Sequence, residues 1–319
     1  MHDDRITLRF MSVPGETSGR GNRIAAGSVL EWIDKAGYAC AVGWAGTYAV
    51  TAYVGNVRYD RPVQVADLVA VHARIIHTGR SSMHVLVSVE TSDVRERHYR
   101  PAADCILVFV AIDEHGAAVE VPEWVPRSDS DRALHSHALE RIQVRQEIKA
   151  AMAQAVYSDA GTTPQSLLRF LVPPSSANWG GNAHGGTVMR WIDEAAYACA
   201  ARWSSTDAVA VYSGGIHFYR PIHIGDIVEI RARLIHTSAR SMHIAIQVHS
   251  ANPRTPNDLA LTTQCMSVFV VPGDDGHAVP VEPLVLRTDE DRALDAFALD
   301  LVERRQRMLP IPRELGWRD

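Results

Sequence analysis

The chain has 319 residues, of which 46% are apolar and 22% charged, and its formal net charge is −5. This balance is typical of a globular protein with enough apolar residues for two cores. The acidic balance and the scattered arginines provide no basic field, so we expect no nucleic-acid partner.

The chain also lacks the patterns of export and of membrane insertion. Its first residues, Met-His-Asp-Asp-Arg, do not show the basic-then-apolar order of a signal peptide. No stretch approaches the ~18–20 uninterrupted apolar residues that a bilayer crossing needs, so we expect no membrane partner. The four cysteines lie among small or aliphatic residues without CxxC spacing, which predicts buried reduced thiols in a cytoplasmic protein and no metal site. These cysteines are Cys40, Cys105, Cys199 and Cys265.

Two copies of one sequence pattern make up most of the chain, with a period near 160 residues. Residues 32–44 and 191–203 agree at nine of thirteen positions, and each segment carries one carboxylate, Asp34 or Asp193. Such a period is the size of a whole domain and far above that of solenoid repeats. We therefore predict one domain at 1–152, a linker at 153–165 and a second domain at 166–319.

Each copy opens with an apolar segment that predicts a strand, at 8–13 and 167–172, and a glycine-rich turn follows at 19–27 and 180–186. The next segment is rich in alanine and apolar almost all round, which predicts a buried helix. It covers residues 28–44 and 187–203.

The rest of each copy alternates between apolar and polar residues with a period of two, which predicts strands. These strands are expected at 48–59, 66–77, 82–91 and 103–113, and at 208–218, 226–236, 241–250 and 261–271. Amphipathic helices are expected to close the copies at 131–150 and 291–307. One buried helix followed by antiparallel strands predicts an α+β fold, in which each sheet curls around its own central helix.

The second copy contains the most distinctive motif, Asn182-Ala183-His184-Gly185-Gly186, directly before its helix. Free backbone N–H groups at a helix start favour negative charge and hold a polarised carbonyl oxygen. Glycine permits the close backbone approach of a ligand. Two glycines before a helix are also typical of a simple turn, and His184 has no carboxylate partner nearby in the sequence.

Asp193 follows Gly186 by seven residues, two turns along the same helical face. A carboxylate there is placed to orient or deprotonate a water molecule. A single aspartate near a helix start is also typical of a capping or dipole interaction. However, both copies place it among Ala, Ile and Trp, where an unpaired charge is costly.

With this motif and the following Arg220-Pro221 and Gly225-Asp226, the chain resembles the hotdog-fold acyl-CoA thioesterases, in particular the double-hotdog cytosolic acyl-CoA hydrolases. The resemblance covers both copies. It implies a tandem hotdog fold, hydrolysis of acyl-CoA to free CoA and a carboxylic acid, and no cofactor beyond the CoA of the substrate. It also implies a homo-oligomer, commonly a trimer of double hotdogs.

The resemblance further implies composite sites, each with the loop from one copy and the acid from the other. The first would join Asn182, His184, Gly185 and Gly186 to Asp34, and the second would join Asn22 and Gly27 to Asp193. In the first site the two glycine amides are expected to polarise the thioester carbonyl. Asp34 would act as general base or as nucleophile.

The two sites are not expected to be equal, because the first copy reads Asn22-Arg23-Ile24-Ala25-Ala26-Gly27 and lacks His-Gly-Gly. The alanines reduce the flexibility of the loop and Ile24 adds bulk. We therefore expect one competent site and one impaired site in each chain.

The phosphates of CoA call for cations near the mouth of a site. The candidates lie in two polar turns and are Arg80, Thr237, Arg240 and Ser241. Two other functions stay open: a hotdog hydroxyacyl dehydratase or enoyl hydratase, which needs a His–acid pair, and a non-catalytic acyl-CoA-binding protein.

Overall fold

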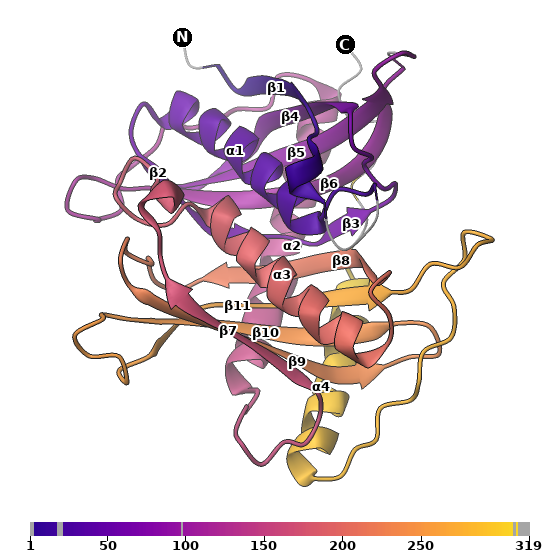
Figure 1. Ribbon diagram of the computed structural model, residues 1–319. Helices are drawn as coiled ribbons and strands as arrows, with labels where there is room; N and C mark the ends of the chain where they lie inside the picture. The colour runs from indigo at the N-terminus through magenta and orange to yellow at the C-terminus, as the bar shows by residue number, and fades with distance from the viewer. Residues whose placement is uncertain (1–2, 18–21, 97, 309–310, 312–319) are drawn as a thin grey trace.

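The computed structural model describes residues 3–17, 22–96, 98–308 and 311. The first half contains β1 (Arg5–Met11), α1 (Ala26–Ala45), β2 (Ala49–Val54), β3 (Val57–Tyr59), β4 (Asp67–Thr78), β5 (Ser82–Asp93), β6 (Arg100–Ala111) and α2 (Asp129–Gln154). The second half contains β7 (Gln165–Leu171), α3 (Gly185–Trp203), β8 (Val209–Phe218), β9 (Ile227–Thr237), β10 (Met242–Ala251), β11 (Ala260–Val270) and α4 (Asp289–Gln306). Figure 1 shows the two halves stacked one above the other.

The element types expected from the sequence are confirmed, and most bounds differ by a few residues. Two of the differences change how the elements connect. The expected strand 48–59 is divided into β2 and β3, with Gly55 and Asn56 between them. A Cβ atom on Gly55 would lie 2.8 Å from the carbonyl oxygen of Ile106. In addition, α2 runs to Gln154, so the connection between the halves covers only 155–164. Residues 18–21 of the glycine-rich turn lie outside the described residues.

The described strands form one antiparallel sheet in the order β1-β4-β5-β6-β2-β8-β11-β10-β9-β7, and β3 pairs with β6 and β8. The halves join where β2 meets β8, with Tyr53 opposite His217 and Val54 opposite Ile216. The two expected curled sheets are thus continuous. The tandem hotdog arrangement of the α+β fold is confirmed.

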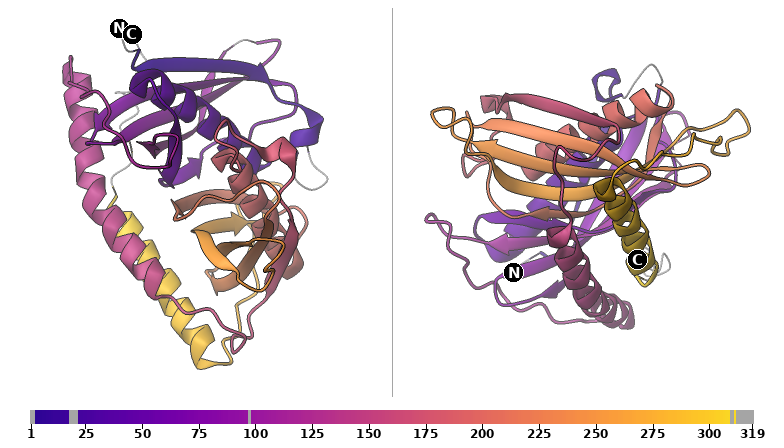
Figure 2. Two further views of the ribbon diagram at one scale, coloured as in Figure 1. Left: turned by 90° about the vertical axis from the view of Figure 1, so that its left-hand side faces the viewer. Right: turned by 90° about the horizontal axis from the view of Figure 1, so that it is seen from below.

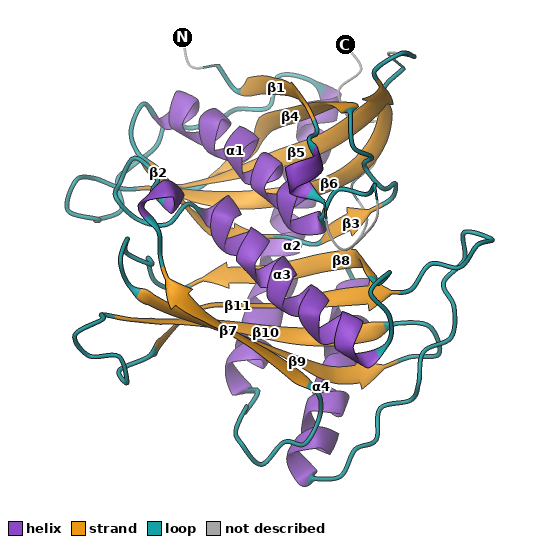
Figure 3. Ribbon diagram, viewed as in Figure 1, coloured by secondary structure: helices purple, strands orange, loops and turns teal. Residues whose placement is uncertain are grey.

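Helices α1 and α3 lie side by side on one face of this sheet (Figures 1 and 3). Their alanines and glycines allow close packing, and Ile33, Ala36 and Ala195 are completely buried. Gly37 lets the ring of Phe109 approach, since a Cβ there would lie 2.9 Å from it. The buried residues around both helices form one continuous apolar core across the two halves.

Helices α2 and α4 lie on the opposite face of the sheet (Figure 2). The N-terminal part of α2 packs through Leu134 on the first half, and its C-terminal part packs through Ile148 and Met152 on the second half. Both helices start with a capping box, at Ser128 and Thr288. The amphipathic closing helices are therefore confirmed, and α2 in addition spans the junction between the halves.

The four cysteines are free and buried. Within the described residues, no helix has the length and apolar character needed to cross a membrane.

Buried histidines lie in the strands of the sheet. Burial lowers the pKa of His84 and of His217 to about 3, with further lowering by Arg145. Burial also lowers the pKa of His243 to about 4, with further lowering by His236 and Arg305. These side chains are neutral in the folded protein, whereas in the unfolded chain they bind a proton below a pKa near 6.5. Their contribution to stability is therefore complete above pH 6.5 and is lost as the pH falls toward the folded pKa.

We expect His217→Phe to flatten the acid side of the stability curve. One histidine of this kind makes the free energy of unfolding fall by about 1.4 kcal/mol per pH unit below 6.5. Urea unfolding of the wild type and the variant between pH 7 and pH 4.5 measures the difference in slope. Parallel curves would show that His217 is not held neutral in the folded protein.

Candidate active site

The N-terminus of each of the helices α1 and α3 forms a hydrogen bond with an aspartate of the other helix. The Gly186 N–H donates to Asp34 Oδ2 at 2.7 Å, and the Gly27 N–H donates to Asp193 Oδ2 at 2.8 Å. Each half thus supplies a helix N-terminus to one site and a carboxylate to the other. This is the pairing of loop and acid that the resemblance implied.

Glycine is required at both contacts because the helices touch there. A Cβ on Gly27 would lie 2.8 Å from Arg190 Cα, and a Cβ on Gly186 would lie 2.8 Å from Glu31 Cα. Both distances are shorter than real Cβ contacts, so any side chain would push the helices apart and break the amide–carboxylate hydrogen bonds.

Asp34 is 1% exposed and both of its carboxylate oxygens are hydrogen bonded. The Thr51 hydroxyl donates to Oδ1 at 2.7 Å. His184 Nδ1 lies 3.0 Å from Oδ2, which Gly186 N–H also reaches. Burial by itself lowers the pKa of His184, but the hydrogen bond and the charge of Asp34 outweigh burial and leave that pKa raised. The arrangement fixes the orientation of the Asp34 carboxylate.

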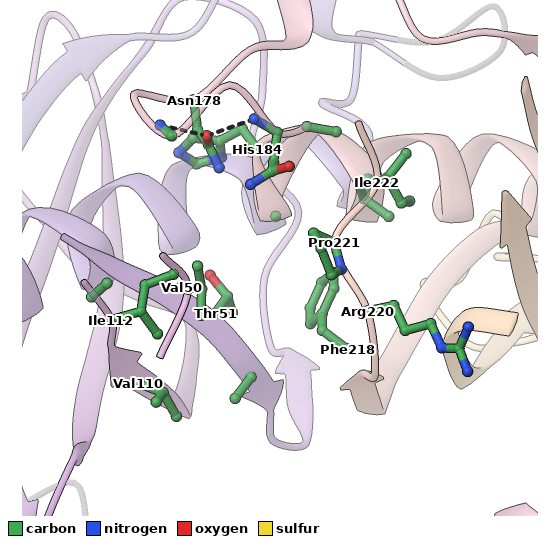
Figure 4. Close-up of a pocket in the computed structure, with 18 of the residues that line it drawn as sticks. Val50, Thr51, Val110, Ile112, Asn178, His184, Phe218, Arg220, Pro221 and Ile222 are labelled. Atoms are coloured by element: carbon green, nitrogen blue, oxygen red, sulfur yellow. Dashed lines mark hydrogen bonds between the residues drawn. The ribbon is translucent and has the colours of Figure 1, made fainter. Parts of the chain in front are cut away.

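A cavity of about 680 Å³ opens beside Asp34. Its walls come from both halves, as Figure 4 shows: Val50, Thr51, Val110 and Ile112 on one side, and Phe218, Pro221 and Ile222 on the other. The size lies in the ordinary range for small-molecule sites. An apolar wall with a few converging polar groups suits a substrate that has an acyl chain and one reactive polar centre.

Asn178 is a polar residue of this cavity that the sequence analysis did not identify. Its Oδ1 accepts from the backbone N–H groups of Gly180 and Asn182 at 2.9 and 3.1 Å. The side chain is therefore fixed, and its Nδ2 group remains as a donor. Asn182, the predicted residue, lines the same cavity, and its backbone pairs with His223.

Thr51 was also missed, although the repeat contained a signal for it. Thr47-Tyr48-Ala49-Val50 aligns with Thr206-Asp207-Ala208-Val209, which sets Thr51 against Ala210. A polar residue that only one copy retains marks a difference between the sites. Its role depends on Asp34 lying opposite, which only the fold shows.

The second cavity, of about 400 Å³, surrounds Asp193 and lacks these partners. Ala210 takes the place of Thr51, and Ala25 takes the place of His184 as the residue before the helix. Asp193 Oδ1 is buried without a hydrogen-bond partner among the described residues. Burial raises the pKa of Asp193 to about 6, and the Gly27 hydrogen bond offsets only part of the effect.

Asn22 does not take the position that the sequence analysis gave it. It is exposed and is absent from the lining of the second cavity. The neighbouring Arg23 bridges to Gln64 as Asn182 bridges to His223. The reason is the one extra residue in the first copy, which moves Asn22 out of register with Asn182.

The cations expected near the mouths are also placed elsewhere. None of Arg80, Thr237, Arg240 and Ser241 lines either cavity. The side chain of Arg80 is 85% exposed and pairs with Glu120 at 3.0 Å. The arginines that do line the cavities are Arg220 in the first and Arg23 and Arg61 in the second. Figure 4 shows Arg220 at the cavity edge, with its guanidinium directed outward.

Among the described residues, no group of three or more His, Cys, Asp or Glu side chains is placed to hold a metal ion. The chemistry that the first site offers is that of a carboxylate, a hydroxyl, an imidazole and amide donors.

Comparison with known proteins gives one family twice. The model of the family described as "Thioesterase superfamily" matches residues 21–97 and 180–257, once in each half. A Bacillus subtilis protein named "Uncharacterized acyl-CoA thioester hydrolase YkhA" is 30% identical over 141 residues, which are 43% of this chain and 82% of that protein.

Longer relatives match both halves. Human "Cytosolic acyl coenzyme A thioester hydrolase" is 25% identical over 304 residues, 90% of this chain and 79% of that protein. Mouse "Acyl-coenzyme A thioesterase 11" is 25% identical over 280 residues, 83% of this chain and 47% of that protein. The match thus covers about half the length of the mouse protein.

We expect Asp193→Asn to stabilise the folded protein at pH 8. The folded pKa of Asp193, about 6, lies above the ordinary value of 3.8, so its ionisation above pH 6 costs about 3 kcal/mol of stability. An asparagine oxygen still accepts from the Gly27 N–H without this cost. Thermal unfolding should show a gain at pH 8 that shrinks as the pH falls through 6 and is nearly absent at pH 4. A gain independent of pH would contradict the explanation.

Proposed function

Since this chain belongs to the thioesterase superfamily, we propose that it hydrolyses acyl-CoA thioesters to free CoA and a carboxylic acid at the first composite site. The observation that carries the proposal is the fixed position of Asp34. Thr51 and Gly186 hold its two oxygens at 2.7 Å each, at the wall of a largely apolar cavity between the halves.

Asp34 and Thr51 act on the attacking side of the thioester. Either the carboxylate removes a proton from a water molecule held beside Thr51, or Asp34 attacks the carbonyl carbon itself and forms a mixed anhydride. In the first route the proton goes to the carboxylate and the hydroxide adds to the carbonyl carbon, so that CoA leaves as its thiol and the carboxylic acid is released. In the second route the acyl group goes to the carboxylate as CoA leaves, and a water molecule then hydrolyses the anhydride, which releases the carboxylic acid and restores Asp34. The neighbouring His184, with its raised pKa, is suited to protonate the departing thiolate.

The carbonyl oxygen needs donors on the opposite side. The Gly186 N–H, which the sequence analysis assigned to this task, already donates to Asp34. The Gly185 N–H lies in the first turn of α3 and makes no hydrogen bond to another described residue. Together with Asn178 Nδ2 it forms the donor pair for the developing oxyanion. One such donor is typically worth about 2.7–4 kcal/mol in the transition state.

One observation favours a second candidate reaction. His184 and Asp34 form a His–acid pair with Nδ1 and Oδ2 3.0 Å apart, which a hydroxyacyl dehydratase or enoyl hydratase requires. An assay of enoyl-CoA hydration, in which the loss of the enoyl absorbance is monitored, distinguishes the two activities. A non-catalytic acyl-CoA-binding protein would show neither reaction.

The proposal also covers the oligomeric state and the cellular location of the protein. The edge strands β1 and β7 expose Met11, Leu167 and Leu171, which are 52–59% exposed. Unpaired sheet edges and exposed apolar residues favour association. We infer a homo-oligomer, with a trimer of this tandem chain favoured, and a cytoplasmic location in which the four thiols stay reduced. CoA takes part only as a portion of the substrate, with no separate cofactor.

We expect Asp34→Asn to reduce kcat for acyl-CoA hydrolysis by at least about 100-fold, since it removes the general base or nucleophile. Asp193→Asn, its counterpart in the other half, should retain most of the activity because the second site lacks Thr51 and His184 equivalents. Free thiol release from short to long acyl-CoAs measures both variants. Equal losses, or a larger loss in Asp193→Asn, would refute the assignment.

We expect Thr51→Ala to reduce kcat by about 10-fold or more, because the substitution removes the hydroxyl that donates to Asp34 Oδ1. Asp34 Oδ1 would then lack a partner, as Asp193 Oδ1 does in the other half. Thr51→Ser should recover much of the rate because it keeps the hydroxyl. If Thr51→Ala and Thr51→Ser behave alike, the hydroxyl has no part in catalysis.

A further inference from the structure

The proposed reaction does not use the second cavity, although this cavity is well formed. Its volume of about 400 Å³ lies within the range of ligand sites. Most of its lining is aliphatic or aromatic, from both halves: Val29, Val63, Ala102, Val209, Val211 and Phe269. An apolar cavity of this kind suits an acyl chain.

Two polar atoms in this cavity have no partner. Asp193 is 5% exposed, and its Oδ1 accepts no hydrogen bond among the described residues. The hydroxyl of Tyr59, another lining residue, is also buried without a partner there. A buried polar group without a partner is energetically costly, so a ligand that pairs both atoms would gain binding free energy.

The first cavity has no acceptor of this kind, although the hydroxyl of Tyr219 in its lining is also buried without a partner among the described residues. Phe218 occupies the repeat position of Tyr59, and Thr51 occupies that of Ala210 and pairs the free oxygen of Asp34. The second cavity therefore differs from the first in the position of its free tyrosine hydroxyl, Tyr59 in place of Tyr219, and in an acceptor without a partner, Asp193 Oδ1. This pair of differences defines a ligand, whereas the loss of catalytic partners alone would not.

A carboxylic acid group matches both atoms, because its O–H donates to Asp193 Oδ1 and its carbonyl oxygen accepts from the Tyr59 hydroxyl. A thioester carbonyl only accepts, so an intact acyl-CoA would leave Asp193 Oδ1 unpaired. Arg23 and Arg61 also line the cavity and favour a ligand with acidic character. The raised pKa of Asp193, about 6, is consistent with one proton shared between two carboxyl groups.

We propose that the second cavity binds a free medium- or long-chain carboxylic acid without turnover, through Asp193 and Tyr59, with the acyl chain against the apolar lining. The acid would be the product released at the first site, and in this respect the inference rests on the proposed function. The binding itself does not depend on catalysis.

The test measures dodecanoate binding to the Asp34→Asn full-length chain by isothermal titration calorimetry. We expect one site per chain. Tyr59→Phe, which removes only the donor, should weaken binding by about 10-fold or more. Ala210→Thr should do the same, because its hydroxyl would pair Asp193 Oδ1 as Thr51 pairs Asp34. Thr51→Ala, the matched change in the first cavity, should leave dodecanoate binding unchanged.

The outcomes are distinct. Unchanged affinity in both Tyr59→Phe and Ala210→Thr, with normal thermal unfolding of each variant, would overturn the proposal. So would displacement of dodecanoate by CoA alone, which would make this cavity a CoA site. Loss of binding in Tyr59→Phe and Ala210→Thr but not in Thr51→Ala would support it. Because binding is measured without turnover, an absence of thioesterase activity would refute only the proposed function.

Discussion

The contact between the starts of α1 and α3 is the constraint on which the molecule depends. The helices approach so closely that only glycine fits at Gly27 and Gly186, and each glycine amide bonds to the aspartate of the other helix. A helix N-terminus carries partial positive charge, so each buried carboxylate is partly neutralised by the helix it touches. The same two contacts set the distance between the halves and place one cavity beside each acid.

The two glycine–aspartate contacts have the same backbone geometry, but the other groups around each aspartate differ. Asp34 contacts a hydroxyl and an imidazole in addition to the amide, so its carboxylate is held by three groups. Asp193 has the amide alone, and burial therefore raises its pKa. The two acids thus have different surroundings because a few positions differ, while the backbone contact is the same in both.

Helix α2 in the outer layer contacts both halves of the chain. Helix α2 begins on the first half and ends on the second, and its Arg145 and Lys149 lie over the rings of Tyr53 and Tyr219. Residues from both sides of the β2–β8 junction are thereby tied to one helix. A rigid junction benefits a site whose walls come from both halves, because a small displacement of one wall would separate Asp34 from the loop that it acts with.

The sequence by itself determined the duplication, the element types and the α+β architecture, because these follow from hydrophobic periodicity and from a repeated motif. The pairing of each loop with the opposite acid was implied by the resemblance to the hotdog thioesterases. Tertiary structure alone decided which neighbours complete each acid. Thr51 lies seventeen residues from Asp34, and Asn178 precedes the expected motif, so neither could be assigned before the chain folded. One inserted residue shifted Asn22 out of register, and the polar turns with Arg80 and Arg240 proved to lie away from both cavities. Local pattern reports which face is buried, whereas hydrogen-bond partners depend on distances between segments that only packing brings together.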